Sequence, residues 1–249
     1  MTSLPETGWP LIPRETLPPP IPVAGRRSAQ RGAPGRPAGR QLSMFGAETT
    51  EASPADLAGL LAGPGQLGRM GGTARVSVVV DAAWRVHVLV AELVARGLAT
   101  TWAPVEDQDQ DPIDAVRDER SAEGETSDTP EEPPPRFEVR TAYSRRLNAL
   151  ATAWPAAAAQ LFLSGPRLRL WVAAAGHPHP GGYRLGLDPG KDPVEVDAAL
   201  VRAGLAGRVT EDRRAYVIAG RRRLTRLTEL VGIRPEAAPS ELWPGGAGA

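Results

Sequence analysis

The sequence predicts an α+β protein in which helices and antiparallel strands occur twice, as a pseudo-twofold repeat. The order helix, strand, helix, strand, helix can be traced in both halves of the apolar-rich sequence. Stretches rich in Pro, Gly or acidic residues interrupt that order, and such compositions are typical of disorder. The sequence contains no run of about 18 apolar residues, which excludes an ordinary membrane span.

Composition predicts where the folded parts begin and end. Residues 1–52 are expected to be a disordered basic arm, because Pro, Gly and Arg dominate them without apolar periodicity. Residues 53–155 are expected to form the first repeat and residues 156–236 the second. A disordered acidic insert is predicted at about 105–135, inside the first repeat, and a disordered tail at 237–249.

The charge is balanced over the whole chain but unevenly distributed. The chain has 29 basic and 29 acidic residues, yet acidic residues far outnumber basic ones between Glu106 and Glu132. The rest of the chain is therefore net positive. Lys191 is the single lysine, so nearly every cation is an arginine, whose forked guanidinium suits phosphates and base edges. The absence of cysteine excludes disulfides, thiolate catalysis and Cys-ligated zinc.

The first repeat is expected to begin with a helix at Pro54–Ala62, because Ser53 suits an N-cap and proline the first helical position. The β-branched run Ala74–Val80 predicts a strand. The remaining elements expected in this repeat are a helix at Ala82–Arg96, strands at Thr100–Ala103 and Phe137–Ala142, and a helix at Ser144–Trp154.

The second repeat is expected to follow the same order. Its elements are a helix at Pro166–Ala175, a strand at Gly182–Leu187, a helix from Asp192 to about Ala203, a hairpin of Arg208–Thr210 with Ala215–Ala219, and a last helix at Arg221–Val231. The run His177-Pro178-His179-Pro180 predicts a loop, because proline favours turns.

The two repeats can be aligned on their closing and opening helices. Arg145-Arg146-Leu147-Asn148-Ala149-Leu150 resembles Arg222-Arg223-Leu224-Thr225-Arg226-Leu227, and the opening helices match at Gly65 and Gly176. The spacing between the opening helices exceeds that between the closing helices by about the length of the acidic insert. The insert is therefore predicted to belong to the first repeat alone.

The opening helices carry a family resemblance. Leu57-Ala58-Gly59-Leu60-Leu61-Ala62-Gly63-Pro64-Gly65 resembles the nine-residue LAGLIDADG motif of homing endonucleases, and Leu168–Gly176 is a more degenerate copy. The resemblance implies two motif helices packed at the centre of a pseudo-dyad, each followed by an antiparallel saddle that straddles duplex DNA. The small residues that would allow this packing are Gly59, Gly65, Ala173 and Gly176. Bacterial WhiA-type regulators have a similar, non-cleaving domain.

The sequence departs from that family where metal binding is concerned. The metal-binding acid of the family is the eighth residue of each motif, and those positions here are Pro64 and Ala175. Two-metal hydrolysis of phosphodiesters requires carboxylates that hold the ions. The departure therefore predicts no metal, no cofactor and no catalytic residue, and hence a protein that is not an enzyme.

Arginines on or beside the predicted strands and at helix starts are the candidates for contact with double-stranded DNA. A saddle would bring strand residues against the duplex, where guanidinium groups bind phosphates. The predicted DNA-binding residues are Arg75, Arg140, Arg145, Arg146, Arg184, Arg208, Arg213, Arg214, Arg221 and Arg222.

A short motif stands at the end of the basic arm. Gln41-Leu42-Ser43-Met44-Phe45 resembles the pentapeptide that binds the bacterial sliding clamp, the β subunit of DNA polymerase III. Gln41 would donate hydrogen bonds at a pocket entrance, while Leu42, Met44 and Phe45 would fill apolar pockets. The resemblance implies a modest, reversible interaction, because a disordered peptide loses entropy on binding.

Together these observations predict a non-catalytic DNA-binding accessory protein that is recruited to the sliding clamp in replication or repair. We expect a cytoplasmic monomer, associated with the nucleoid or replisome, whose repeats form an internal pseudo-dimer with no membrane partner. Two alternatives stay open: an active LAGLIDADG-type endonuclease with displaced metal ligands, and a WhiA-like transcriptional or scaffold protein.

Overall fold

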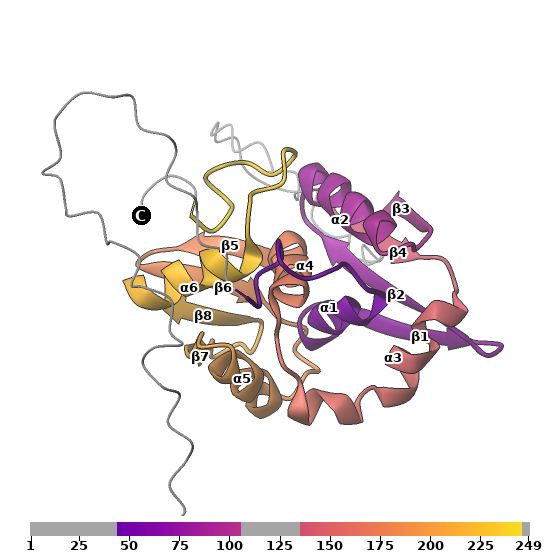
Figure 1. The fold of residues 1–249 in the computed structure, drawn as a ribbon. Helices are drawn as coiled ribbons and strands as arrows, with labels where there is room; N and C mark the ends of the chain where they lie inside the picture. Colours follow the sequence, from indigo (N-terminus) through magenta and orange to yellow (C-terminus); the bar gives the residue numbers. More distant parts are fainter. Residues whose placement is uncertain (1–43, 106–134, 246–249) are drawn as a thin grey trace, which may run out of the picture. The chain divides into compact units, whose positions relative to one another are not determined.

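The computed structural model describes residues 44–105 and 135–245. The first repeat is drawn in indigo to red in Figure 1. Its elements are η2 (Pro54–Leu57), α1 (Ala58–Ala62), β1 (Gln66–Met70), β2 (Thr73–Val80), α2 (Ala83–Ala95), β3 (Thr100–Pro104), β4 (Phe137–Thr141), η3 (Arg145–Leu147) and α3 (Asn148–Ala153).

The second repeat runs from salmon to yellow in Figure 1. A short connection, η4 (Ala156–Gln160), leads into it. Its elements are α4 (Gly165–Ala175), β5 (Gly176–His179), β6 (Gly182–Gly186), α5 (Pro193–Arg202), β7 (Arg208–Val209), β8 (Ala215–Ala219) and α6 (Arg221–Val231). Within the described ranges, no helix has the length and apolar character needed to cross a bilayer.

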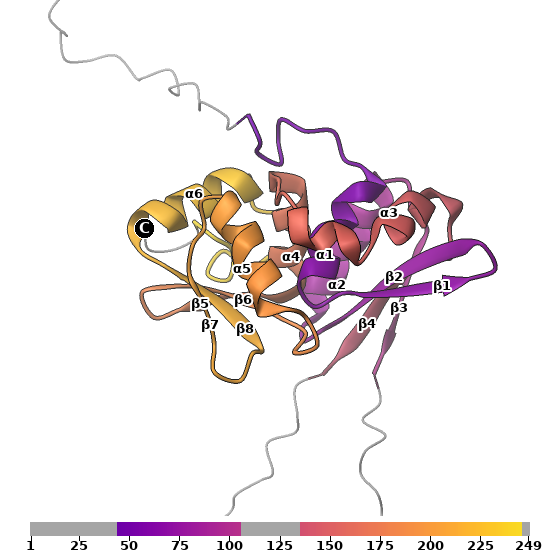
Figure 2. The same cartoon turned by 90° about the horizontal axis from the view of Figure 1, so that it is seen from below.

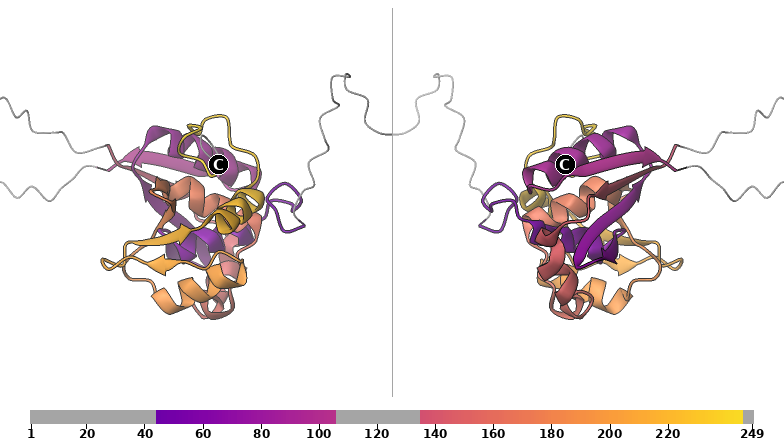
Figure 3. Two further views of the ribbon diagram at one scale, coloured as in Figure 1. Left: turned by 90° about the vertical axis from the view of Figure 1, so that its left-hand side faces the viewer. Right: turned by 90° about the vertical axis from the view of Figure 1, so that its right-hand side faces the viewer.

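Each repeat contains one antiparallel sheet of four strands, and the two sheets have the same topology. The strand orders are β1-β2-β4-β3 and β5-β6-β8-β7. The helices cover one face of each sheet, as the view in Figure 2 shows. The side views in Figure 3 show the magenta sheet and the orange-yellow sheet diverging from the central helices. The α+β fold with a pseudo-twofold repeat of helix and antiparallel saddle, predicted from the sequence, is confirmed.

Two strands were not predicted. β1 begins directly after Gly65, and β5 begins at Gly176, so each central helix continues into the first strand of its sheet. The interpretation of His177–Pro180 as a loop is wrong, because His177 and His179 lie in β5. Proline is tolerated there because β5 is an edge strand, paired only with β6. β1 escaped notice because Gly68 breaks its apolar alternation.

The central helices α1 and α4 cross at a glycine. A Cβ atom placed on Gly59 would lie 2.0 Å from the backbone oxygen of Arg167, so only glycine lets the two backbones approach this closely. The crossing is buried, since every residue of α1 and the run Leu170–Ala174 of α4 are almost inaccessible to solvent. The two repeats therefore share one apolar core around the helix pair.

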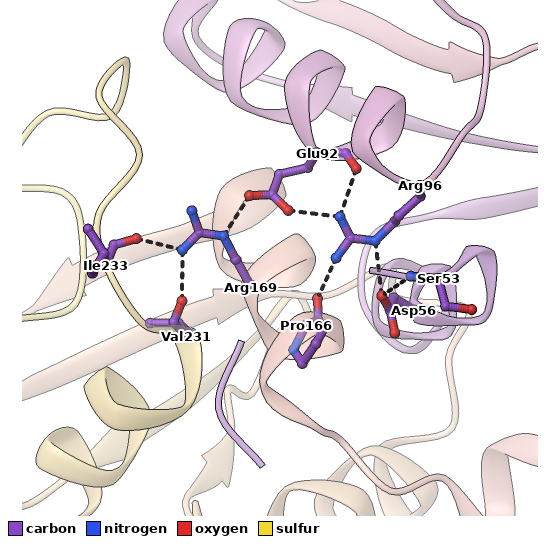
Figure 4. A network of polar contacts seen from close by, with 8 residues as sticks. All are labelled: Ser53, Asp56, Glu92, Arg96, Pro166, Arg169, Val231 and Ile233. Atoms are coloured by element: carbon purple, nitrogen blue, oxygen red, sulfur yellow. Dashed lines mark hydrogen bonds and ion pairs between the residues drawn. The ribbon is translucent and has the colours of Figure 1, made fainter. Parts of the chain in front are cut away.

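An ion-pair network joins α2 of the first repeat to α4 of the second repeat (Figure 4). The Nε atom of Arg96 donates to Asp56 at 3.1 Å, and its Nη1 atom donates to Glu92 at 2.8 Å. Arg169, from the other repeat, donates to Glu92 at 2.6 Å and to the backbone oxygen of Val231 at 2.8 Å. The chain of contacts thus runs from η2 through α2 to α4 and the end of α6.

Charge compensation makes this network stable only while Glu92 is ionised. Burial raises the pKa of Glu92, but its ion pairs with Arg169 and Arg96 outweigh that effect and lower the pKa below its ordinary value. Because the carboxyl binds its proton less tightly in the folded state, its contribution is complete above the ordinary glutamate pKa. It is lost as the pH falls further.

Residues 44–52, which we call the strap, lie on the folded domain although the sequence places them in the arm. The backbone nitrogen of Ala47 donates to the oxygen of Leu230 at 2.8 Å, and that of Gly165 donates to the oxygen of Phe45 at 2.7 Å. The predicted tail also contributes to the core, because Ala238 and Trp243 are buried. Composition misses these segments because isolated apolar anchors leave no periodic pattern.

Replacing Gly59 with Ala is expected to destabilise the protein by about 2–3 kcal/mol, because the added methyl group forces the central helices apart. Gly190→Ala is the matched control, since a Cβ there would meet nothing closer than Asp188 Oδ1 at 3.1 Å. Urea unfolding of both variants measures the difference. Equal stabilities would mean that the crossing is looser than described.

Glu92→Gln is expected to lower the free energy of unfolding by about 3 kcal/mol at neutral pH, because it leaves Arg96 and Arg169 without their shared carboxylate. The deficit relative to the unmodified protein should stay constant down to about pH 4, near the ordinary glutamate pKa, and shrink as the pH falls further, because the pKa of Glu92 is lowered in the folded protein. The control is Glu229→Gln, which breaks an exposed pair with Arg226 and should cost under about 1 kcal/mol. A deficit that does not change with pH would contradict the assignment.

Candidate nucleic-acid interface

The faces of the two sheets that point away from the helices form the candidate interface. In β2, Val76, Val78 and Val80 are buried against the helices, while the residues between them are more exposed. Side chains alternate across a strand, so Arg75 and Ser77 lie on the opposite, outward face. The same alternation in β6 buries Tyr183 and Leu185 and places Arg184 outward.

The strand registers set up matching rows of side chains across the two outward faces. Because paired residues share a face, each row can be followed from the edge strand next to the dyad to the far edge. The rows are Gln66, Ser77, Arg140 and Thr101 in the first sheet, and His177, Arg184, Val217 and Arg208 in the second. Arg140, Arg184 and Arg208 thus occupy one equivalent band.

The predicted arginines fall into three groups. Arg75 joins the band residues on the outward face, where its guanidinium lies 5.0 Å from the ring centre of Tyr143. Arg213 and Arg214 lie in the turn between β7 and β8. The other four predicted residues are in the first turns of the helices that follow each sheet: Arg145, Arg146, Arg221 and Arg222. Arg146 donates to the backbone oxygen of Gly97 at 3.2 Å, so it has a structural role there.

A buried arginine of α2, Arg85, caps the C-terminal end of α4 beneath this surface. Arg85 is 1 % exposed, and it donates to the backbone oxygens of Ala173 and Gly176 at 3.1 and 2.7 Å. A cation at a helix C-terminus compensates the partial negative charge of the last carbonyls. Arg85 also binds Asp81 at 2.7 Å, and His177 Nε2 lies 3.3 Å from the other oxygen of Asp81.

The same arrangement recurs at the end of α1, with residues from the opposite repeat. Lys191 Nζ donates to the backbone oxygen of Gly65 at 3.0 Å, as Arg85 does to that of Gly176. Gln66 donates to Asp188, just as His177 contacts Asp81. Each aspartate follows the second strand of its sheet, so the two clusters are related by the pseudo-dyad.

The electrostatics of these clusters are dominated by their cations. The hydrogen bond from His177 lowers the pKa of Asp81, and Arg85 adds to this effect against the burial that raises it. Burial lowers the pKa of Lys191. Asp81 therefore lies beside the cation of Arg85, and Asp188 lies near the cation of Lys191. The two clusters form a polar boundary between the repeats.

These residues do not form a site for a divalent ion in this arrangement. Pro64 and Ala175 offer no ligand, and both oxygens of Asp81 are engaged by Arg85 and His177. Asp188 accepts hydrogen bonds from Gln66 and from the backbone nitrogen of Gly190. Across residues 44–105 and 135–245, no three His, Asp or Glu side chains lie close enough together to hold a metal ion.

Sequence reasoning missed the central clusters because their partners are far apart in the chain. Gln66 and Asp188, for example, come from different repeats. One signal was available: an aspartate follows both second strands, at Asp81 and Asp188, and the chain has a single lysine beside the latter.

The other predicted residues lie in different places. Gly59 and Ala173 are buried in the central helices, whereas Gly65 and Gly176 lie where those helices end. Of the pentapeptide predicted to bind the clamp, Gln41, Leu42 and Ser43 lie outside the described residues. Met44 is exposed, and Phe45 contacts Phe162.

Solved structures similar to this chain are those of homing endonucleases. One concerns mesophilic variants of the homing endonuclease I-DmoI, at 14% identity and a TM-score of 0.41, covering 72% of this chain and 94% of that one. Another is I-WcaI bound to its DNA recognition sequence, at 9% identity and a TM-score of 0.48, covering 75% and 84%. A third is I-DmoI in complex with DNA and Mn, at 13% identity and a TM-score of 0.40, covering 73% and 97%.

No family model matches the chain, and the search of curated proteins finds no match. The expectation that the protein is not an enzyme is contradicted by the structural matches, because homing endonucleases are enzymes. That expectation relied on the two missing motif acids alone. The structure itself has one four-stranded antiparallel sheet after each of two central helices, as the LAGLIDADG resemblance of the sequence predicts.

Proposed function

We propose that this protein binds double-stranded DNA across the outward faces of its two sheets, and that the pentapeptide Gln41–Phe45 recruits it to the bacterial sliding clamp during replication or repair. The observation that carries the DNA proposal is the equivalent band of Arg140, Arg184 and Arg208 on the two sheets. The similarity to I-WcaI bound to its DNA recognition sequence supports it only at the level of the fold.

The chemistry of the outward faces suits a duplex. Guanidinium groups on adjacent strands bind phosphates, and the polar side chains of Ser77, Thr101 and Gln66 supply donors and acceptors for base edges. Antiparallel strands are known to read DNA grooves in other proteins. Two sheets related by a pseudo-dyad would address two successive segments of one duplex.

Cleavage of the bound duplex is a second candidate function. The observation that favours it is the pair of carboxylates, Asp81 and Asp188, which approach the ends of the central helices from opposite repeats. Both carboxylates are bound to neighbouring side chains, so a metal ion would have to displace those contacts first. A comparison of Asp81→Asn and Asp188→Asn with the unmodified protein on duplex DNA, with Mg²⁺ or Mn²⁺ added, tests this candidate.

The clamp part of the proposal is carried by the pentapeptide. Its apolar residues resemble anchors that fill pockets, and tethering to a clamp would raise the local concentration of the protein at DNA. The alternative of a WhiA-like regulator or scaffold would need no clamp contact, so direct binding measurements separate the two.

Arg184→Ala combined with Arg208→Ala is expected to weaken duplex binding and to reduce the dependence of log K on log salt by about two, because two phosphate contacts are lost. Fluorescence anisotropy with a labelled duplex between ~50 and ~200 mM salt measures both effects. The matched control is Arg167→Ala with Arg202→Ala, which removes two arginines from the helix layer. Equal weakening by both double variants would contradict the sheet-face interface.

A peptide spanning residues 38–48 is expected to bind the sliding clamp, and Leu42→Ala or Phe45→Ala should weaken binding by at least ~2 kcal/mol, because apolar anchors carry most of the energy. Ser43→Ala serves as the control and should change the affinity little. Isothermal titration calorimetry with the purified clamp is the measurement. The absence of binding at high micromolar peptide would refute recruitment by this motif.

A further inference from the structure

Two of the three phenylalanines in the chain meet where the strap lies on the second repeat. The rings of Phe45 and Phe162 are 5.5 Å apart and inclined by 75°, an edge-to-face pair. Phe45 is 49 % exposed and Phe162 is 40 % exposed, so about half of each residue remains accessible to solvent. Met44, the preceding pentapeptide residue, is 79 % exposed.

Hydrogen bonds hold the backbone of the strap on the second repeat, in addition to the contact of the Phe45 ring. The carbonyl of Phe45 accepts from the backbone nitrogen of Gly165, the first residue of α4, and so satisfies one of the free donors at that helix start. A Cβ on Gly165 would lie 2.3 Å from the nitrogen of Ala47, so this close fit requires glycine. Glu48 in turn accepts from the backbone nitrogen of Ile233.

We propose that the packing of Phe45 on Phe162 is an autoinhibitory contact that competes with the sliding clamp for the pentapeptide. The inference rests on the clamp recruitment proposed above. A ring that fills a pocket of a partner is surrounded by that partner, whereas here part of the Phe45 ring is covered by Phe162. The two contacts of Phe45 exclude each other, so Phe45 alternates between a closed state on the domain and an open state on the clamp.

The effect of the closed state on the apparent affinity for the clamp can be calculated. When only a fraction of the molecules is open, the apparent dissociation constant of the full chain exceeds that of the isolated motif by the inverse of that fraction. An edge-to-face pair contributes a modest energy, so loss of the Phe162 ring should tighten clamp binding by roughly two- to tenfold. A free peptide has no closed state and sets the upper limit of affinity.

The experiment compares the affinity of the purified sliding clamp for the full chain, for its Phe162→Ala variant and for the peptide 38–48. We expect the peptide to bind tightest, the variant next and the unmodified chain weakest. Phe137→Ala is the matched control, because it removes the other edge-to-face phenylalanine, paired with Trp102 at 5.9 Å and 76°. This control should leave clamp binding unchanged.

Hydrogen exchange on the unmodified full chain provides a readout that does not depend on a variant folding. The amides of Ala47 and Gly165 are expected to exchange faster when the clamp is added, because their bonds to Leu230 and Phe45 open. Unchanged exchange, or Phe162→Ala binding no tighter than the unmodified chain, would overturn the autoinhibitory contact while the peptide still binds. A peptide that does not bind would instead overturn clamp recruitment itself, and this inference with it.

Discussion

The structure depends on the close approach of α1 and α4 at Gly59. Because no side chain separates the helices there, the two repeats share a single buried core and their sheets extend from one centre. α4 continues directly into β5, and only Gly63, Pro64 and Gly65 separate α1 from β1, so the direction of the helices sets the direction of both outward faces. The candidate interface is thus positioned by a backbone contact in the core.

Charged groups also hold the two repeats together, at both ends of the pair formed by α1 and α4. On one side, Glu92 joins Arg96 and Arg169 from different repeats. On the other side, Arg85 and Lys191 each bind the carbonyl at the end of the opposite repeat's central helix. Breaking such a buried pair leaves an uncompensated charge, so these contacts select one relative placement of the repeats. This placement of the repeats also fixes the positions of the two outward faces.

Much of the fold could be predicted from the sequence, because the signals were local. The β-branched run of β2 and the alternation in β4 mark strands, and the Ser53–Pro54 pair marks a helix start. β5 escaped because its prolines are typical of a loop and only the pairing with β6 reveals the strand. The central clusters escaped because Gln66 and Asp188, or Arg85 and Gly176, meet only after both repeats have folded. Arg140, Arg184 and Arg208 were found as candidates, but their shared band follows from strand register, which the sequence does not display.

The function of the outward faces can be tested by oxidative footprinting with and without duplex DNA. Met70 and His177 report on the outward faces, whereas Trp102, 53 % exposed, lies on the helix side of the first sheet in register with the buried Val139. Binding across the sheets predicts that DNA protects Met70 and His177 from oxidation and leaves Trp102 unchanged. Protection of Trp102 with no change at Met70 and His177 would place the duplex on the helix side and contradict the account.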